Sequence, residues 1–322
     1  MITYSLPKVR SKLFRDALSI YYPINKLFSR DSLRGVSARY TTQAVLDFEK
    51  FQNNDYLNNL FIQSRNYFAI PIPDQILELG CGAGNLTMPL LKNTSATIFA
   101  TDISRQQLSI LGGLLDSGKF SHRVHLIQLD SSQDFFENSS FDLIVGSAIA
   151  HHLIDPLVLI DLSLRWLRVN GSLLFFEPIL SGSLIVREAI LEVLNSVSAD
   201  LPREVVKFLG GIAVDIAARS DDLTELSYSQ RSKLDDKSFV DIDLIKQKFT
   251  NVVVAVMPIL DHTSNRVLSQ HIENILKYYL LWEKFELLPE SFWNILKRYD
   301  SLFSTSDSSP VIEGAIYIKR VS

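Results

Sequence analysis

Between residues 76 and 178, short runs of apolar residues alternate with segments in which apolar residues recur at helical spacing. The short runs are typical of buried strands, and the helical segments are typical of helices that cover a sheet. Five strands are predicted, at 76–79, 96–100, 124–129, 141–147 and 172–177. Helices are expected at 85–92, from the cap Ser104 to Gly118, and from Pro156 to Asn170. This alternation predicts a parallel, doubly wound α/β sheet whose strands end at one edge.

Both flanks of this core carry helical patterns. The first seventy residues are expected to form helices that are interrupted at Pro23. The C-terminal part predicts two more strands, at 251–257 and 314–319, with a helical insertion at 263–303 between them. The chain therefore divides into a helical N-terminal extension, a core, a helical insertion and a terminal strand pair: 1–70, 71–178, 179–250 and 251–322.

The helical segments are expected to fold over the strand ends as a lid. Residues 263–303 are rich in aromatic side chains. Such side chains suit an apolar or aromatic ligand, but they are equally compatible with a core of the lid's own.

A glycine-rich turn follows the first predicted strand. Gly80, Gly82 and Gly84 are spaced as G-x-G-x-G, and Asn85 stands where a dinucleotide fingerprint needs its third glycine. No lysine-containing phosphate loop follows, which excludes a P-loop. Glu78, just before the turn, would repel a pyrophosphate and favour a cationic ligand. The turn therefore favours a ligand with positive charge and without phosphate.

This turn resembles motif I of the class I S-adenosylmethionine-dependent methyltransferases. The segment 141–156, with its two histidines and Asp155-Pro156, resembles the fourth-strand motif of the family's small-molecule members. The resemblance implies a Rossmann-like, doubly wound, seven-stranded and mostly parallel sheet. In such a sheet the seventh strand lies antiparallel between the fifth and the sixth. The predicted strands 251–257 and 314–319 would supply these two, although about 60 residues separate them instead of a hairpin turn.

The resemblance also implies the cofactor and its contacts. S-adenosylmethionine would bind at the strand ends and leave as S-adenosylhomocysteine. Asp102 would meet the ribose, Ile103 the adenine ring, and Asp130 with Ser131 the adenine amino group. The complete predicted cofactor site is Glu78, Gly80, Cys81, Gly82, Gly84, Asp102, Ile103, Asp130, Ser131 and Ser147.

Methyl transfer needs an aligned acceptor and a group that takes the acceptor's proton. His151 and His152 lie where the fourth strand ends, and histidine is the usual base near neutral pH. His152 is favoured because the family more often keeps a histidine there, although both could instead have structural roles. Glu177, at the end of the fifth strand, is a further candidate. No metal site is predicted, because no catechol-type set of ligands is evident.

Composition and charge limit the kinds of binding partner and the cellular location that are expected. The net charge is −4, which argues against a protein built mainly to hold nucleic acid. Residues 1–40 hold eight Lys or Arg and two Asp, so they form a basic arm for docking or an ordinary solvated face. Cys81 is the single cysteine, which suits a reducing compartment and a cytoplasmic protein. No apolar run is long enough for a transmembrane segment. The sequence is compatible with a homodimer.

The predicted function is therefore methyl transfer from S-adenosylmethionine to a small apolar or aromatic acceptor, at O, C or N. The acceptor could be free or carrier-bound. Two alternatives remain: a catalytically idle module that binds the cofactor, and a dinucleotide-dependent oxidoreductase on the same fold.

Overall fold

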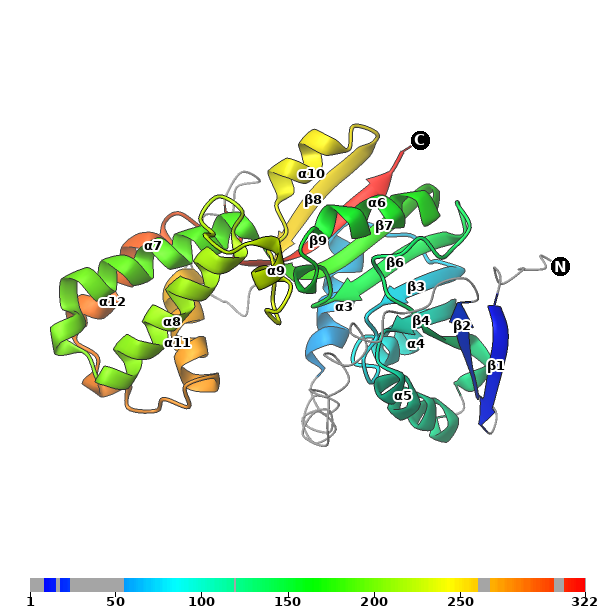
Figure 1. Ribbon diagram of the computed structural model, residues 1–322, viewed down its shortest axis with the longest axis horizontal. Helices are drawn as coiled ribbons and strands as arrows, with labels where there is room; N and C mark the ends of the chain where they lie inside the picture. Colours follow the sequence, from blue (N-terminus) through cyan, green and yellow to red (C-terminus); the bar gives the residue numbers. More distant parts are fainter. Residues whose placement is uncertain are drawn as a thin grey trace.

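The computed structural model describes residues 9–15, 18–23, 55–118, 120–259, 267–303 and 310–321. One sheet runs through the molecule (Figure 1). Its strands are β1 (Val9–Arg15), β2 (Leu18–Pro23), β3 (Gln75–Leu79), β4 (Thr97–Asp102), β5 (Val124–Gln128), β6 (Phe141–Ser147), β7 (Leu167–Pro178), β8 (Val252–Pro258) and β9 (Glu313–Arg320). They pair in the order β1-β2-β5-β4-β3-β6-β7-β9-β8.

The strands β3 to β9 form the seven-stranded, mostly parallel sheet that was predicted. Strands β3 to β7 are parallel to one another. Strand β9 lies between β7 and β8 and runs antiparallel to both. The long connection between β8 and β9 therefore leaves their pairing intact, and the predicted fold class is confirmed.

The N-terminal segment differs from its helical prediction. Strands β1 and β2 form an antiparallel pair, and β2 pairs in parallel with β5 through Ile20 and Tyr21. Strand β5 would otherwise be a sheet edge, whose unpaired backbone groups attract a further strand. The helical prediction is therefore wrong for β1 and β2. Helix α3 (Tyr56–Tyr67) is helical as predicted, and residues 24–54 lie outside the described part.

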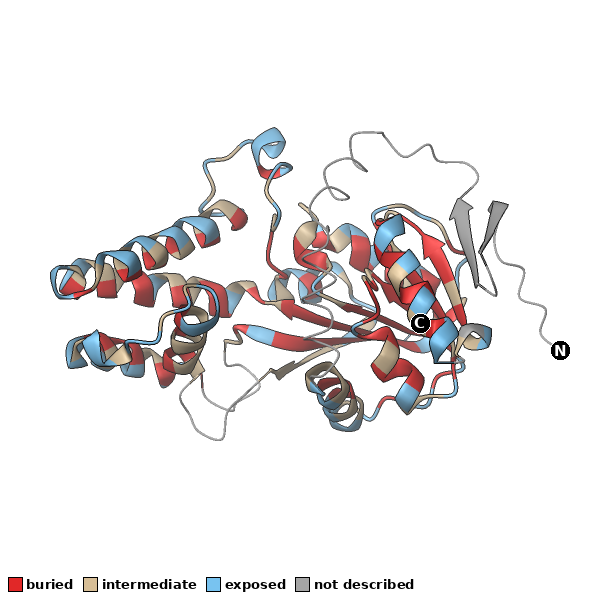
Figure 2. Ribbon diagram, turned by 90° about the horizontal axis from the view of Figure 1, so that it is seen from below, coloured by how far each residue is buried: buried red, intermediate tan, exposed pale blue. Residues whose placement is uncertain are grey.

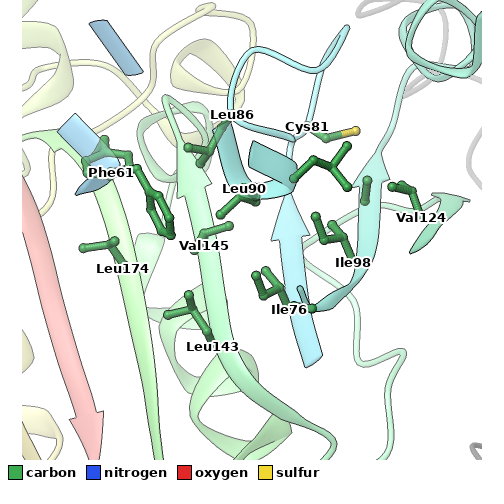
Figure 3. Close-up of a cluster of buried hydrophobic side chains, with 14 of the residues drawn as sticks. Phe61, Ile76, Cys81, Leu86, Leu90, Ile98, Val124, Leu143, Val145 and Leu174 are labelled. Atoms are coloured by element: carbon green, nitrogen blue, oxygen red, sulfur yellow. The ribbon is translucent and has the colours of Figure 1, made fainter. Parts of the chain in front are cut away.

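Helices cover both faces of the sheet. The remaining α-helices are α4 (Thr87–Asn93), α5 (Arg105–Ser117), α6 (Pro156–Trp166), α7 (Leu180–Val197), α8 (Arg203–Arg219), α9 (Tyr228–Arg231), α10 (Ile242–Lys248), α11 (Val267–Tyr278) and α12 (Glu290–Asp300). Because side chains alternate along a strand, Ile76 packs with α3, α4 and α5, whereas Leu77 packs with α6 and α10. Figure 3 shows the first cluster, in which Phe61 lies beside Leu174 and Val145.

The sequence signals at helix ends are mostly confirmed. The Ser104 side chain accepts a hydrogen bond from the backbone N–H of Gln107, and Asp155 caps α6 in the same way. Helix α6 nevertheless ends at Trp166, earlier than predicted, and β7 begins at once with Leu167 paired to Phe141. The turn residues near Asn170, whose φ is +68°, make an irregularity within this strand instead of a helix end.

Helices α7, α8, α11 and α12 gather in a lobe beyond the carboxyl end of β7 (Figure 1). Their inward faces are buried and their outer faces exposed (Figure 2). Phe292 is fully buried in this lobe, whereas Tyr278 and Tyr279 are exposed. The predicted aromatics therefore serve at least partly as the lobe's own core. Among the described residues, no helix is long and apolar enough to cross a membrane.

Candidate functional site

The glycine turn, residues 80–84, has the backbone that its sequence predicted. Gly80, Gly82 and Gly84 all have positive φ, at +66°, +53° and +105°. A Cβ atom on Gly82 would meet no heavy atom within 4 Å, so its position opens toward space beside the turn. A Cβ on Gly80 would lie 2.8 Å from Cδ1 of Ile149. The turn is thus open to a ligand at Gly82 and tightly packed against the end of β6 at Gly80.

Asp102 closes this turn from the end of β4. Its carboxylate accepts hydrogen bonds from the backbone N–H of Gly82, at 2.8 Å, and of Ser104, at 2.7 Å. Burial raises the pKa of Asp102, and these hydrogen bonds partly offset that rise. A carboxylate has about four lone-pair positions, so Asp102 can also accept hydrogen bonds from a diol such as a ribose.

Glu78 lies beneath the turn with only 1% of its surface exposed. The Thr87 hydroxyl donates to its Oε2 at 2.6 Å, a partner that the sequence analysis did not identify. Burial, reinforced by the nearby Asp102 charge, raises the pKa of Glu78 to about 8. A cation bound beside Glu78 would favour its charged form. Cys81 is buried and burial raises the pKa of its thiol, which fits a small packing residue.

The remaining predicted cofactor residues lie at the ends of β4, β5 and β6. Asp130 accepts from the backbone N–H and the hydroxyl of Ser132, at 3.0 and 2.7 Å, and so caps its own turn. Ser131 is buried, whereas Ile103 and Ser147 are partly exposed. The Gln128 amide donates to the carbonyl of Ile103 at 3.0 Å, which ties the loops after β4 and β5 together.

The second part of the site is the histidine turn, residues 148–153, which follows β6. Glu177 from the neighbouring β7 organises it. Its Oε1 accepts from the backbone N–H groups of Ile149 and Ala150, at 2.7 and 2.8 Å. Its Oε2 lies 2.7 Å from Nδ1 of His151. The side chain of Glu177 has no exposed surface, so it cannot touch a bound substrate and can act only by holding the histidine turn.

The two histidines have different surroundings, although their ring centroids are only 4.3 Å apart. Burial by itself lowers the pKa of His151, but the hydrogen bond and charge of Glu177, with Asp236, outweigh it and raise the pKa. Burial and the neighbouring His151 lower the pKa of His152. The His152 side chain is 31% exposed, against 10% for His151. His152 is therefore the more accessible and the less readily protonated of the pair.

A segment far along the chain completes the histidine turn. This segment, which we call the strap, comprises residues 220–241 between α8 and α10. The backbone N–H groups of Lys237 and Ser238 donate to the carbonyl of His151, at 2.8 and 3.2 Å. Asp236 thereby reaches both imidazoles, with its Oδ1 3.5 Å from Nε2 of His151 and 3.4 Å from Nδ1 of His152. Sequence analysis missed Asp236, because no local pattern marks it.

Comparison with known families and proteins points to one kind of domain. Residues 77–173 match the family model described as "Methyltransferase domain". The malonyl-[acyl-carrier protein] O-methyltransferase of Halalkalibacterium halodurans is 37% identical over 108 residues, which cover 32% of this chain and 38% of that protein. The tRNA N(3)-methylcytidine methyltransferase Mettl2 of Drosophila melanogaster is 34% identical over 115 residues, covering 33% and 35%. The chain thus spans less than two fifths of these relatives.

Solved structures resemble the chain more distantly. Phosphoethanolamine N-methyltransferase 2 of Haemonchus contortus, in complex with S-adenosyl-L-methionine, has a TM-score of 0.49 and 14% identity, covering 94% of this chain and 61% of that one. Geranyl diphosphate C-methyltransferase of Streptomyces coelicolor A3(2) has a TM-score of 0.43 and 9% identity, with 77% and 71% covered.

Proposed function

Because its core is a class I S-adenosylmethionine-dependent methyltransferase domain, we propose that this chain transfers a methyl group to a small organic acceptor. S-adenosylmethionine is the cofactor, and S-adenosylhomocysteine is the product that it leaves. One observation carries the choice of site. The glycine turn and the histidine turn touch, because Gly80 packs against Ile149 at the shared edge of β3 and β6. A methyl donor at the first turn would therefore lie beside the second.

The cofactor's positions follow from the contacts at the strand ends. Gly82 leaves open space for the methionine part, and Asp102 has lone pairs free for the ribose hydroxyls. Glu78, beneath the turn, would favour the cationic end of the ligand. The other predicted contacts, Ile103 and Asp130 with its neighbours, lie at the ends of β4 and β5, where the adenine would extend.

The acceptor would lie at the histidine turn. The cofactor supplies an activated methyl group, so the protein must align the acceptor and remove its proton. His152 fits the role of proton acceptor, because it is the more exposed histidine and its pKa is lowered. Glu177 fits a positioning role, because it holds the turn from behind. A hydroxyl, an amine or an acidic carbon would all meet these requirements.

The identity of the acceptor has two sources of support that point in different directions. The malonyl-[acyl-carrier protein] relative favours an acid or its carrier-bound form, whereas the tRNA methyltransferase relative favours nucleic acid. The net charge of −4 favours the former, because phosphate backbones are held mainly by clustered basic side chains. We therefore propose a small acceptor, free or carrier-bound, and a cytoplasmic site of action.

Two measurements test the proposal. Calorimetry should detect binding of S-adenosylmethionine and of S-adenosylhomocysteine but not of NAD; the reverse preference would favour an oxidoreductase. Radioactive methyl transfer should then be followed with phenols, amines, carboxylic acids, malonyl-acyl carrier protein and transfer RNA as acceptors. Labelling of RNA alone would contradict the proposed acceptor class. Cofactor binding with no labelling of any acceptor would support an idle binding module instead.

A further inference from the structure

Three side-chain atoms and one backbone oxygen converge where the strap meets the histidine turn. They are Nε2 of His151, Nδ1 of His152, Oδ1 of Asp236 and the carbonyl oxygen of Asp235. Oδ1 of Asp236 lies 3.5 Å from the first nitrogen and 3.4 Å from the second. The Asp235 carbonyl oxygen lies 3.1 Å from Nδ1 of His152. A carbonyl oxygen can only accept, so Nδ1 of His152 carries a hydrogen when no ion is bound. One atom from each of the three side chains falls within 4.8 Å of the others.

The Glu177 contact decides which atom of His151 faces this point. The carboxylate of Glu177 can only accept, so Nδ1 of His151, 2.7 Å away, carries the hydrogen of that bond. In the neutral ring, Nε2 then carries a lone pair, and it faces the carboxylate oxygen of Asp236. Two lone pairs at this separation repel each other unless a positive charge lies between them. Either a proton on Nε2 or a bound cation can supply that charge.

We propose that His151, His152 and Asp236 bind a divalent transition-metal ion of the Zn²⁺ type. Bonds from Zn²⁺ to imidazole nitrogen or carboxylate oxygen are about 2.0–2.2 Å long, so tetrahedral ligand atoms lie about 3.3 Å apart. The separations of 3.4 and 3.5 Å from Asp236 agree with this spacing. The two histidine nitrogens lie within 4.8 Å of each other, and binding an ion would draw them to the same spacing. Two imidazoles and one carboxylate suit Zn²⁺, Fe²⁺ or Co²⁺, whereas Mg²⁺ and Ca²⁺ prefer oxygen ligands throughout.

The side chains behind the ligands hold them in place, as they do in metal sites generally. Glu177 fixes the ring of His151 through Nδ1. Arg219 at the end of α8 lies 3.4 Å from Oδ2 of Asp236, which leaves Oδ1 facing the histidines. Arg219 also donates to the carbonyl of Ser238 at 3.1 Å and so anchors the strap. The Asp236 side chain is 40% exposed, which leaves an ion a route from solvent.

This inference goes beyond the proposed methyl transfer and does not depend on it. An ion bound to Nδ1 of His152 would replace the hydrogen that faces the Asp235 carbonyl and leave a hydrogen on Nε2. His152 could not then take a proton from the methyl acceptor. Metal binding and proton uptake by His152 therefore exclude each other. Transfer assays should accordingly be run with a chelator, whereas the metal is tested by binding alone.

The test is calorimetric titration of the chelator-treated protein with Zn²⁺, together with the visible spectrum of its Co²⁺ complex. We expect the wild type to bind one Zn²⁺ ion. Asp236→Asn and His152→Asn should each weaken this binding about 100-fold or more, because losing even a residue that only holds a metal ligand in place typically costs about 10–100-fold in metal affinity. His122→Asn is the matched control, because His122 is an exposed histidine before β5 and belongs to neither the strap nor the histidine turn. It should bind as tightly as the wild type.

Three results would overturn the proposal. They are the absence of a Zn²⁺ site, equal binding by the wild type and Asp236→Asn, and a thiolate charge-transfer band that assigns the Co²⁺ to Cys81. The positive charge at Nε2 of His151 would then be a proton. Titration of each variant with S-adenosylmethionine checks that it is folded, and it also separates a failed metal site from a failed methyltransferase assignment.

Discussion

The carboxylate of Glu177 and the imidazole of His151 meet at 2.7 Å, across the boundary between β7 and the turn that follows β6. The same carboxylate also accepts from the backbone N–H groups of Ile149 and Ala150. One buried side chain therefore fixes both the path of the histidine turn and the orientation of its first ring. In the proposed reaction this arrangement places His152, the next residue, at the acceptor.

Replacing Glu177 with alanine should lower the stability of the protein. The change leaves the buried N–H of Ala150 and the partly buried N–H of Ile149 without an acceptor, and a buried unsatisfied group costs about 1–3 kcal/mol. Urea denaturation should show a loss of about 3 kcal/mol in the free energy of unfolding. Glu137→Ala is the control, because Glu137 is exposed and should change stability by less than about 0.5 kcal/mol. Similar losses in the two variants would contradict the role assigned to Glu177.

Replacing His152 with alanine should slow methyl transfer without weakening cofactor binding. General-base catalysis typically contributes about 10²–10⁴-fold, so kcat should fall by that factor in assays that contain a chelator. The dissociation constant of S-adenosylmethionine, measured by calorimetry, should stay within about threefold of the wild type. His151→Ala is the paired variant. If these two variants and the double variant all turn over as the wild type does, the histidines are structural.

Replacing Asp102 with alanine should weaken binding of S-adenosylmethionine. The loss of this acceptor of ribose hydroxyl hydrogen bonds corresponds to about 1–3 kcal/mol. Calorimetry is the measurement, and Asp116→Ala is the control, because Asp116 is an exposed acid at the end of α5. Gly82→Val should be worse than Asp102→Ala, since a branched side chain would fill the open space and resist a φ of +53°. Unchanged affinity in folded Asp102→Ala would exclude the ribose contact.

Glu78 should make the cofactor-free protein less stable as the pH rises. Its pKa is raised from 4.5 to about 8 in the folded protein, so between these values the folded state holds a proton that the unfolded state has released. The free energy of unfolding therefore falls through this window. Glu78→Gln removes the titration, and its stability relative to the wild type should improve by about 2 kcal/mol or more between pH 5 and pH 8. If the difference in the free energy of unfolding between the two proteins does not change with pH, the raised pKa of Glu78 is contradicted.

The same shift predicts a proton-linked cofactor affinity. If the ammonium of S-adenosylmethionine lies near Glu78, binding favours the ionised carboxyl and releases a proton near pH 7. Calorimetry in two buffers of different ionisation enthalpy should detect this release in the wild type. Glu78→Gln should bind more weakly and release less. Equal proton release by both proteins would show that Glu78 does not supply the proton, and it would contradict a role for Glu78 in cofactor binding.

The sequence by itself determined the parts of the protein that local patterns encode. Short apolar runs that alternate with helical segments predicted the five parallel strands, because such strands are buried on both faces between helices. The three glycines predicted the tight turn, because Gly80, Gly82 and Gly84 need positive φ there. The position of His151 and His152 near the end of β6 followed from their place in the chain after the predicted strand 141–147. These features depend on neighbours within a few residues or on a known order of strands.

Tertiary structure decided what depends on distant partners. The strands β1 and β2 form where the edge of β5 offers unpaired backbone groups, so the helical prediction failed for residues 9–15 and 18–23. Asp236 reaches the histidines only because Arg219 and the backbone of residues 237–238 fasten the strap to the turn. Glu177 was recognised as a candidate, but its buried position behind His151 follows from the pairing of β6 with β7. Hydrogen bonds and charge contacts across such distances leave no periodic trace in the sequence, and only the folded chain brings these groups together.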